Sequence, residues 1–246
     1  MILAAGLGTR LRPLTNDRPK ALIVIAGRTL LEITLAGLRA CGVKQVIVNV
    51  HHFADQVVDY LRANANFGMR IEVSREDELL DTGGGLKKAA WFFQEDSANC
   101  DAPFLLHNVD VLSNIDLSRM LDTHKATGAL ATLAVQNRAT SRYLLFDDHS
   151  ALCGRRAGRD GNSELVRPCP SPHPLAFSGI HVISPRLLSM LTEQGAFSIV
   201  TSYLRLAAQG KNVQAFPADE YYWRDLGRPE NITQAEQDIA NEIVRI

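Results

Sequence analysis

The sequence predicts an α/β fold: a single domain built on a doubly wound, mostly parallel, Rossmann-like sheet. Three observations lead to this prediction. Apolar β-branched runs alternate with amphipathic segments in the first half of the chain, the order that places helices between parallel strands. A turn containing two glycines follows the first apolar run directly. The chain has 246 residues, of which 46% are hydrophobic, which suits one substantial core.

Composition and charge exclude several classes of protein. The formal net charge is −1 at pH 7, so no broad basic surface for a nucleic acid is expected. No apolar run reaches the ~18 residues of a membrane-spanning helix, and no signal peptide is recognisable. The four cysteines lack C-x-x-C spacing, which is typical of reduced thiols. We expect a cytoplasmic protein with neither a nucleic acid nor a membrane as partner, compatible with a homo-oligomer.

The first motif is a short apolar strand that leads into Gly6 and Gly8. Glycine tolerates positive φ and lets backbone N–H groups approach a ligand closely. Three cationic side chains, those of Arg10, Arg12 and Lys20, surround this turn. Small residues, exposed amides and fixed positive charge together suit a polyphosphate. The glycines alone would also fit an ordinary strand-to-helix turn.

Two named phosphate-binding motifs do not match this stretch. The P-loop pattern G-x-x-x-x-G-K-[ST] does not occur. The dinucleotide fingerprint requires a third glycine where Leu11 stands, and Pro13 would break the helix that should begin there. The first strand is very short, so we expect a few N-terminal residues to be missing from this sequence.

The remaining elements follow in order along the chain. Thr29 and Glu32 form the pattern of a capping box, and the helix that they open ends at Gly42. Strands are expected at 45–50, 69–74, 103–107, 130–135, 177–183 and 213–216. Further helices are expected at 55–64, 86–93, 116–126, 186–191 and 198–209, with a C-terminal helix within 228–246.

One long segment, 138–174, shows no periodicity. It contains Arg155, Arg156, Arg159 and Arg167 among glycines and prolines. We expect an irregular insertion, which is either a solvated loop or a lid that closes over an anionic substrate.

Two further sites contain residues suited to binding a metal ion or a ligand. Asp110 follows a buried strand, and an aspartate at the carboxyl end of a central strand is suited to Mg²⁺, although it could equally cap the next turn. The run Gly83-Gly84-Gly85 precedes an expected helix. It is either a flexible turn or a backbone surface that fits against a flat base or sugar, with the hydroxyl of Thr82 beside it.

The first motif as a whole resembles the signature of the sugar-1-phosphate nucleotidylyltransferases, G-x-G-T-R-L-x-P-L-T followed by P-K. In this chain it occupies 6–15 and 19–20. The segments Phe177–Ile183 and Tyr222–Gly227 also resemble family motifs. The resemblance implies transfer of a nucleoside monophosphate from a nucleoside triphosphate to a sugar 1-phosphate, with release of pyrophosphate and with Mg²⁺ as cofactor. Both substrates are therefore the expected partners.

The resemblance also implies roles for individual residues. The expected catalytic residues are Arg10, Lys20 and Asp110, and the expected metal ligands are Asp110 and Asp225. The expected nucleotide-binding residues are Ala4, Ala5, Gly6, Gly8, Thr9, Thr82, Gly83, Gly84 and Asn108. The residues expected to bind the sugar phosphate are Arg167, Ser178 and Gly179.

Three positions depart from the family pattern. Val109 replaces the glycine of a Gly-Asp pair, Arg167 the lysine of Glu-Lys-Pro, and Arg228 a threonine after Gly227. These departures favour the alternative of a catalytically weak nucleotide-sugar sensor or regulatory subunit. The aspartates and basic residues that are retained favour the enzyme. The chain looks most similar to bacterial N-acetylmuramate-1-phosphate uridylyltransferases and mannose-1-phosphate guanylyltransferase-like proteins, which favours UTP slightly over GTP as donor.

Overall fold

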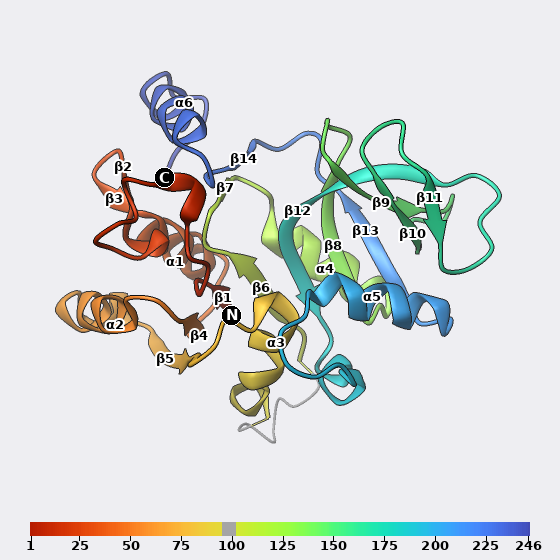
Figure 1. Cartoon of the computed structure of the whole chain (residues 1–246), viewed down its shortest axis with the longest axis horizontal. Coiled ribbons are helices and arrows are strands. Elements are labelled where there is room, and N and C mark those ends of the chain that lie inside the picture. Colours follow the sequence, from red (N-terminus) through yellow and green to blue (C-terminus); the bar gives the residue numbers. More distant parts are fainter. Residues whose placement is uncertain (95–101) are drawn as a thin grey trace.

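A mixed β-sheet with helices on both faces forms the centre of the molecule (Figure 1). The computed structural model describes residues 1–94 and 102–246, so Cys100 lies outside the described residues. Along the sheet the strand order is β11-β10-β9-β12-β6-β1-β4-β5, and β8 lies between β12 and β13. The doubly wound α/β fold predicted from the sequence is confirmed.

The strands of this sheet are β1 (Ile2–Leu3), β4 (Gln45–Val50), β5 (Arg70–Arg75), β6 (Phe104–Asn108), β8 (Ala131–Gln136), β9 (Arg142–Phe146), β10 (Leu152–Ala157), β11 (Ser163–Leu165), β12 (His173–Ile183) and β13 (Val213–Pro217). Two small ribbons are formed by β2 (Val24–Ile25) with β3 (Arg28–Thr29) and by β7 (Val111–Ser113) with β14 (Trp223–Asp225). The α-helices are α1 (Leu30–Ala40), α2 (Ala54–Ala63), α3 (Asp81–Lys88), α4 (Leu117–Thr127), α5 (Ile199–Ala208) and α6 (Pro229–Ala240). Short 3₁₀ turns occupy Thr9–Leu11, Lys20–Leu22, Ala65–Gly68, Ala90–Phe93 and Pro185–Met190.

The parallel half of the sheet places the ends of its strands together. Strand β1 is parallel to both β4 and β6, and Leu3 lies opposite Asn49 on one side and Asn108 on the other. The chain leaves β1 for β4 and β5, then returns to build β6 on the opposite side of β1. Such a change of direction opens a crevice at the carboxyl ends of the strands, where ligands bind in open α/β sheets.

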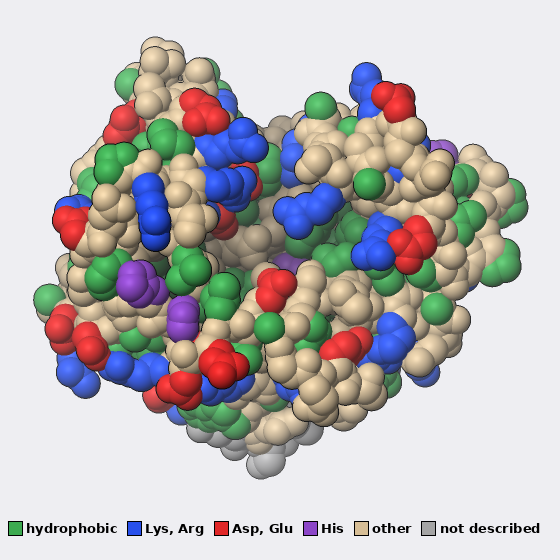
Figure 2. Space-filling model, viewed as in Figure 1, with side chains coloured by type: hydrophobic (Ala, Val, Ile, Leu, Met, Phe, Trp, Pro, Cys, Tyr) green, Lys and Arg blue, Asp and Glu red, His purple; other side chains and the backbone are tan. Residues whose placement is uncertain are grey.

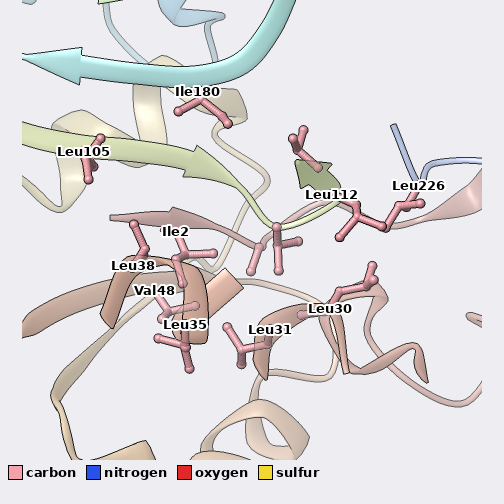
Figure 3. Packing of buried hydrophobic residues seen from close by; sticks show 14 of the residues in the cluster. Ile2, Leu30, Leu31, Leu35, Leu38, Val48, Leu105, Leu112, Ile180 and Leu226 are labelled. Carbon is pink, nitrogen blue, oxygen red and sulfur yellow. The ribbon is translucent and has the colours of Figure 1, made fainter. Parts of the chain in front are cut away.

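Alternation along the strands divides the core into two layers. Ile2, Val48 and Leu105 face one layer, where Leu31 and Leu35 of α1 pack (Figure 3). Their neighbours along the strands face the opposite layer, against α3 and α5. Since successive strand side chains point to opposite faces, an apolar run buried on both faces needs helices on both sides.

Helix α1 begins and ends as its sequence predicts. The Thr29 side chain accepts a hydrogen bond from the Glu32 N–H at 3.1 Å, which satisfies one of the free N–H groups of the first turn. Beyond the helix, Gly42 has φ +86°, a conformation that favours glycine.

The prediction of irregular structure over 138–174 was wrong. Strands β9, β10 and β11 form an antiparallel ribbon within it, and β9 also pairs with β12. This ribbon lies at the end of the molecule opposite α2 (Figure 1). Glycines and charged residues interrupt the alternation of apolar and polar side chains by which its strands could have been recognised in the sequence. Its strands are stabilised by the hydrogen bonds between them and by a cross-strand ion pair, in which Arg155 Nε lies 2.7 Å from Glu164 Oε2.

The glycine run 83–85 is also not a turn. Helix α3 already begins at Asp81 and ends at Lys88, and a separate 3₁₀ turn follows it. The N–H groups of Gly83 and Gly84 donate to the Phe197 carbonyl at 2.9 and 3.3 Å. The glycines are helical here because their missing side chains let this neighbouring segment pack directly onto the helix.

Two expectations from composition concern the described residues. None of the helices within 1–94 and 102–246 is both long and apolar enough to cross a membrane. Cys41, Cys153 and Cys169 are free thiols, and the last two are buried.

Replacing Gly83 by alanine tests this packing. A Cβ at Gly83 would overlap the Phe197 ring and lie 2.9 Å from the Phe197 carbonyl oxygen. We therefore expect Gly83→Ala to lower the free energy of unfolding by about 1–3 kcal/mol, measured by urea denaturation. Gly37→Ala in α1 is the control, because a Cβ there meets no atom within 4 Å. It should raise stability by up to ~1 kcal/mol. Equal effects of the two substitutions would contradict this account.

Candidate functional site

A cleft of about 750 Å³ opens at the carboxyl ends of the central strands. Residues that follow β6 line it together with β12, β14, the β9–β10 ribbon and the first turn of α5. Lys and Arg side chains gather on both sides of this hollow (Figure 2). Its volume lies within the range of pockets that hold nucleotide-sized ligands.

The glycine loop after β1 has the conformation that its sequence requires. Gly8 has φ +63°, and a Cβ there would lie 2.9 Å from the Thr15 methyl carbon. The Thr15 hydroxyl donates to the Gly8 carbonyl at 2.9 Å, which fixes the turn. Earlier in the loop, the Ala4 N–H donates to Asn49 Oδ1 at 2.7 Å, and Ala5 is buried. The backbone beyond, from Gly6 to Thr9, is more exposed.

An ion pair joins the last part of the first motif, the 3₁₀ turn that begins at Lys20, to the cleft. Lys20 Nζ contacts Asp110 Oδ2, and Lys20 is only 8% exposed. Asp110 follows β6, and its carbonyl accepts a hydrogen bond from the Leu226 N–H at 2.7 Å. The pair therefore brings the cation of the first motif onto the carboxylate that the sequence analysis selected as a metal ligand.

The second carboxylate, Asp225, reaches the same place through strand pairing. Strand β14 is antiparallel to β7, and Asp225 lies opposite Val111, the residue after Asp110. Asp225 Oδ1 accepts a hydrogen bond from the Gly227 N–H at 2.6 Å. A Cβ at Gly227 would lie 2.6 Å from that oxygen and 2.8 Å from Arg10 Nη2, so Arg10 reaches this corner too.

The donor set at this corner fits Mg²⁺. Asp110 and Asp225 both line the cleft. No cluster of three or more His, Cys, Asp or Glu side chains suited to a metal occurs within the described part of the chain. Mg²⁺ is commonly held by only one or two carboxylates, with water and substrate phosphates as its other ligands. Two carboxylates next to basic side chains match that requirement.

A close backbone approach shapes the middle of the cleft. Gly179 has φ +76°, and a Cβ there would lie 2.8 Å from Asn108 Nδ2. Beside it, the Trp223 indole N–H donates to the Ser178 carbonyl at 2.7 Å. The buried Ser178 hydroxyl has no hydrogen-bond partner among the described residues. Ser178 and Gly179, which the sequence analysis expects to bind the sugar phosphate, both line the cleft.

Arg138 is a cleft residue that the sequence analysis missed. Its guanidinium lies 3.6 Å from the centroid of the Trp223 ring, and Nη2 donates to the Phe177 carbonyl at 2.8 Å. Burial lowers the pKa of Arg138, and the nearby Asp225 carboxylate opposes that shift. Arg138 follows β8 by two residues, in a stretch without periodicity, so no spacing in the sequence marked it.

His181 lines the cleft as a neutral side chain. Burial lowers its pKa to about 3, with a smaller contribution from His107. The ring contacts the Tyr203 hydroxyl at 2.8 Å. With so low a pKa it is a weak base, so the chemistry of this cleft has to proceed without a strong general base from this residue.

Arg167, expected to bind the sugar phosphate, lies outside the cleft lining. Its Nη2 donates to Asp147 Oδ2 at 2.6 Å and to the Ala151 carbonyl at 2.8 Å, and its Nε donates to the Leu152 carbonyl at 2.9 Å. These contacts hold the β9–β10 turn. Arg138, Arg142, Arg155 and Arg156 line the cleft instead.

The three residues of the Thr82-Gly83-Gly84 run differ in position. Thr82 lines the cleft, but its hydroxyl accepts the Ile199 N–H at 3.0 Å, at the start of α5. Gly83 and Gly84 are buried between helices and do not line the cleft.

Val109 requires no unusual backbone conformation. It is not among the described residues with positive φ, and it is 4% exposed. Its N–H donates to the Leu3 carbonyl at 3.1 Å, which extends the β1–β6 ladder by one bond. Valine therefore replaces glycine here without strain.

Comparisons with known proteins show which sequences and structures this chain is similar to. The family model for nucleotidyl transferases matches residues 1–145. The chain is 35% identical to N-acetylmuramate alpha-1-phosphate uridylyltransferase of Caulobacter vibrioides, over 98% of this chain and 96% of that protein. It is 29% identical to mannose-1-phosphate guanyltransferase of Candida albicans, over 94% of this chain but only 61% of the relative's length. UDP-glucose pyrophosphorylase from Acinetobacter baumanii has the same fold, with a TM-score of 0.79 and 19% identity over 98% of this chain and 92% of that one.

A substitution at Arg167 tests its structural role. Because Arg167 and Asp147 are mostly buried and hydrogen-bonded, we expect Arg167→Gln to lower the free energy of unfolding by about 1–3 kcal/mol. The control is Arg228→Gln, since Arg228 is exposed and lies 3.7 Å from Glu230. It should change stability by less than ~0.5 kcal/mol in the same denaturation experiment. Unchanged stability of Arg167→Gln would contradict the assignment.

Proposed function

The chain belongs to the nucleotidyl transferase family, and on that basis we propose that it is a sugar-1-phosphate nucleotidylyltransferase. It transfers a nucleoside monophosphate from a nucleoside triphosphate to a sugar 1-phosphate and releases pyrophosphate. The observation that carries this proposal is the convergence of Lys20, Asp110 and Asp225 at one end of the cleft. Both named relatives act on a sugar 1-phosphate, which supports the same substrate class here.

The reaction is an in-line attack of a phosphate oxygen of the sugar 1-phosphate on the α-phosphorus of the nucleotide. That oxygen is already an anion, so no general base has to remove a proton. The barrier comes from charge repulsion and alignment. A cleft whose histidine stays neutral therefore suits this chemistry.

The basic residues around the glycine loop lower this barrier. Lys20 Nζ and the Arg10 guanidinium neutralise charge that builds on the α-phosphate and on the leaving pyrophosphate. The loop from Gly6 to Thr9 offers its backbone N–H groups to the phosphates. Asp110 and Asp225 would hold Mg²⁺, which would supply further positive charge to the reacting phosphates.

The middle of the cleft binds the sugar. Ser178 and Gly179 line it together with Asn108, whose Nδ2 would lie 2.8 Å from a Cβ at Gly179. Arg138 takes the place that the family gives to a lysine, because it lies near Asp225 in the cleft whereas Arg167 does not line it. We assign the sugar 1-phosphate to Arg138.

The direct test measures pyrophosphate release by the unmodified protein with Mg²⁺, four nucleoside triphosphates and several sugar 1-phosphates. The proposal predicts turnover of at least one pair. If no pair reacts while nucleotide sugars bind tightly, the protein is a nucleotide-sugar sensor and the proposal is wrong.

Metal removal and carboxylate substitution form one prediction. EDTA should abolish turnover, and Asp110→Ala or Asp225→Ala should lower kcat about 10²-fold or more, because a charge-stabilising group in the transition state is worth a few kcal/mol. Both variants should also weaken binding of Mn²⁺ in the presence of nucleotide. Asp122→Asn, an exposed carboxylate on α4, is the control and should retain wild-type activity. Full activity with EDTA present would exclude the metal.

The choice of donor is a separate prediction. We expect UTP to be preferred over GTP, because the uridylyltransferase of Caulobacter vibrioides is 35% identical to this chain and is matched over 96% of its own length. The measurement is kcat/KM for each nucleotide with one sugar 1-phosphate. A value for GTP tenfold above that for UTP would instead assign the protein to the guanylyltransferases.

A further inference from the structure

The cleft holds more positive charge than one sugar 1-phosphate uses. Arg138, Arg142, Arg155 and Arg156 line the wall formed by β9, β10 and the residues after β8. The positive charge of Arg155 is paired with the Glu164 carboxylate, with 2.7 Å between Nε and Oε2. Within the described ranges, neither Arg138 nor Arg156 forms an ion pair with a carboxylate. If Arg138 meets the 1-phosphate, and Lys20 and Arg10 meet the nucleotide phosphates, the charges of Arg142 and Arg156 have no anion assigned to them; of these two, Arg156 has the buried Nε.

Unsatisfied hydrogen-bond donors mark the same wall. Four buried side-chain atoms lack a partner within residues 1–94 and 102–246, and three of them belong to residues that line the cleft: Arg138 Nε, Arg156 Nε and Ser178 Oγ. A buried donor without an acceptor is costly, and a guanidinium donor more so. Their concentration in one cleft indicates a ligand that supplies the acceptors.

An aromatic ring holds Arg156 in place. Its guanidinium lies 5.3 Å from the centroid of the Tyr143 ring, and the two residues are directly opposite each other in the β9–β10 ladder. The Tyr143 hydroxyl accepts a hydrogen bond from the Thr140 N–H at 3.3 Å. A guanidinium fixed against a ring keeps its donors oriented, which suits recognition of a planar or tetrahedral anion.

The position of Arg156 separates it from the reacting phosphate. In the sheet, β10 is separated from β12 by β9, and β12 lies next to β6. With neighbouring strands about 4.8 Å apart, Arg156 starts roughly 10 Å from the strand that carries Gly179 and still farther from the end of β6. That distance suits a substituent on the far side of a sugar ring whose 1-phosphate lies near Asp225.

We propose that the sugar 1-phosphate used by this protein carries a second acidic group, and that Arg156 binds this group. The proposal rests on the function given above. It names the substrate class: an acidic sugar 1-phosphate, in place of a neutral hexose 1-phosphate. The acidic group is a carboxylate or a second phosphate, since a guanidinium forms charge-assisted hydrogen bonds with both.

Matched pairs of substrates test the proposal. Glucuronate 1-phosphate differs from glucose 1-phosphate by a carboxylate, and glucose 1,6-bisphosphate differs from it by a phosphate. N-acetylmuramate 1-phosphate differs from N-acetylglucosamine 1-phosphate by a carboxylate-bearing ether. We expect at least one acidic member to exceed its neutral partner about 30-fold in kcat/KM, the size expected for a charged hydrogen bond. The pair that shows the preference identifies the anion and its place on the ring.

A variant of Arg156 links the preference to this residue. Arg156→Gln should lower kcat/KM for the acidic member at least tenfold more than for its neutral partner, and Arg156→Lys should restore part of the preference. Arg62→Gln on α2, an exposed arginine outside the cleft, is the matched control and should keep the full preference. Comparing the two substrates within one variant cancels any loss of folded protein.

The outcomes separate this proposal from the proposed function. Equal turnover of acidic and neutral members overturns the second acidic group and leaves the transferase activity intact. An equal loss for both members in Arg156→Gln overturns the role of Arg156. If no member of any pair reacts, calorimetric titration decides: tighter binding of an acidic member, lost in Arg156→Gln, supports the proposal, and equal binding overturns it.

Discussion

The ion pair between Lys20 and Asp110 is the interaction on which the site depends. It joins the 3₁₀ turn Lys20–Leu22 to the segment that follows β6, and the two residues are 90 positions apart in the sequence. Removing two charges from water is costly, and loss of either partner would leave the other uncompensated. In the proposed reaction, phosphates compete for Lys20 and a metal ion competes for Asp110. The pair thus keeps both charges ordered in the cleft until the substrates replace each partner.

The two halves of the sheet make different contributions to this site. The parallel half, formed by β5, β4, β1 and β6, ends its strands together and brings the glycine loop beside the residues that follow β6. The antiparallel additions, β9 to β12, build the wall that carries Arg138 and Arg156. Strand β14 then returns to β7 and delivers the second aspartate. In the proposed function, the parallel half therefore serves the phosphates and the added wall serves the sugar.

The arginines show why a charged residue in the sequence does not by itself reveal whether its side chain faces the cleft. Arg167 stands where the family pattern has the lysine of Glu-Lys-Pro, yet its guanidinium binds Asp147 and two carbonyl groups of the β9–β10 turn. Arg138 matches no motif, yet it stacks on Trp223 at the centre of the cleft. A guanidinium satisfies whichever acceptors the fold places within its reach. The same residue type therefore stabilises a turn at one position and faces a ligand at another.

The sequence by itself determined the α/β fold, the parallel direction of the first strands and the capped helix α1. It also singled out the first motif, which includes Lys20, and Asp110 at the end of a buried strand. These features depend on local periodicity, capping and short spacings, which a linear chain displays directly. Only the tertiary structure decided that 138–174 forms strands, that Gly83 packs inside a helix, and that Arg138 and Arg156 share a wall. Each of these depends on a partner distant in sequence: β12 for the ribbon, Phe197 for the glycine, and Trp223 and Tyr143 for the arginines.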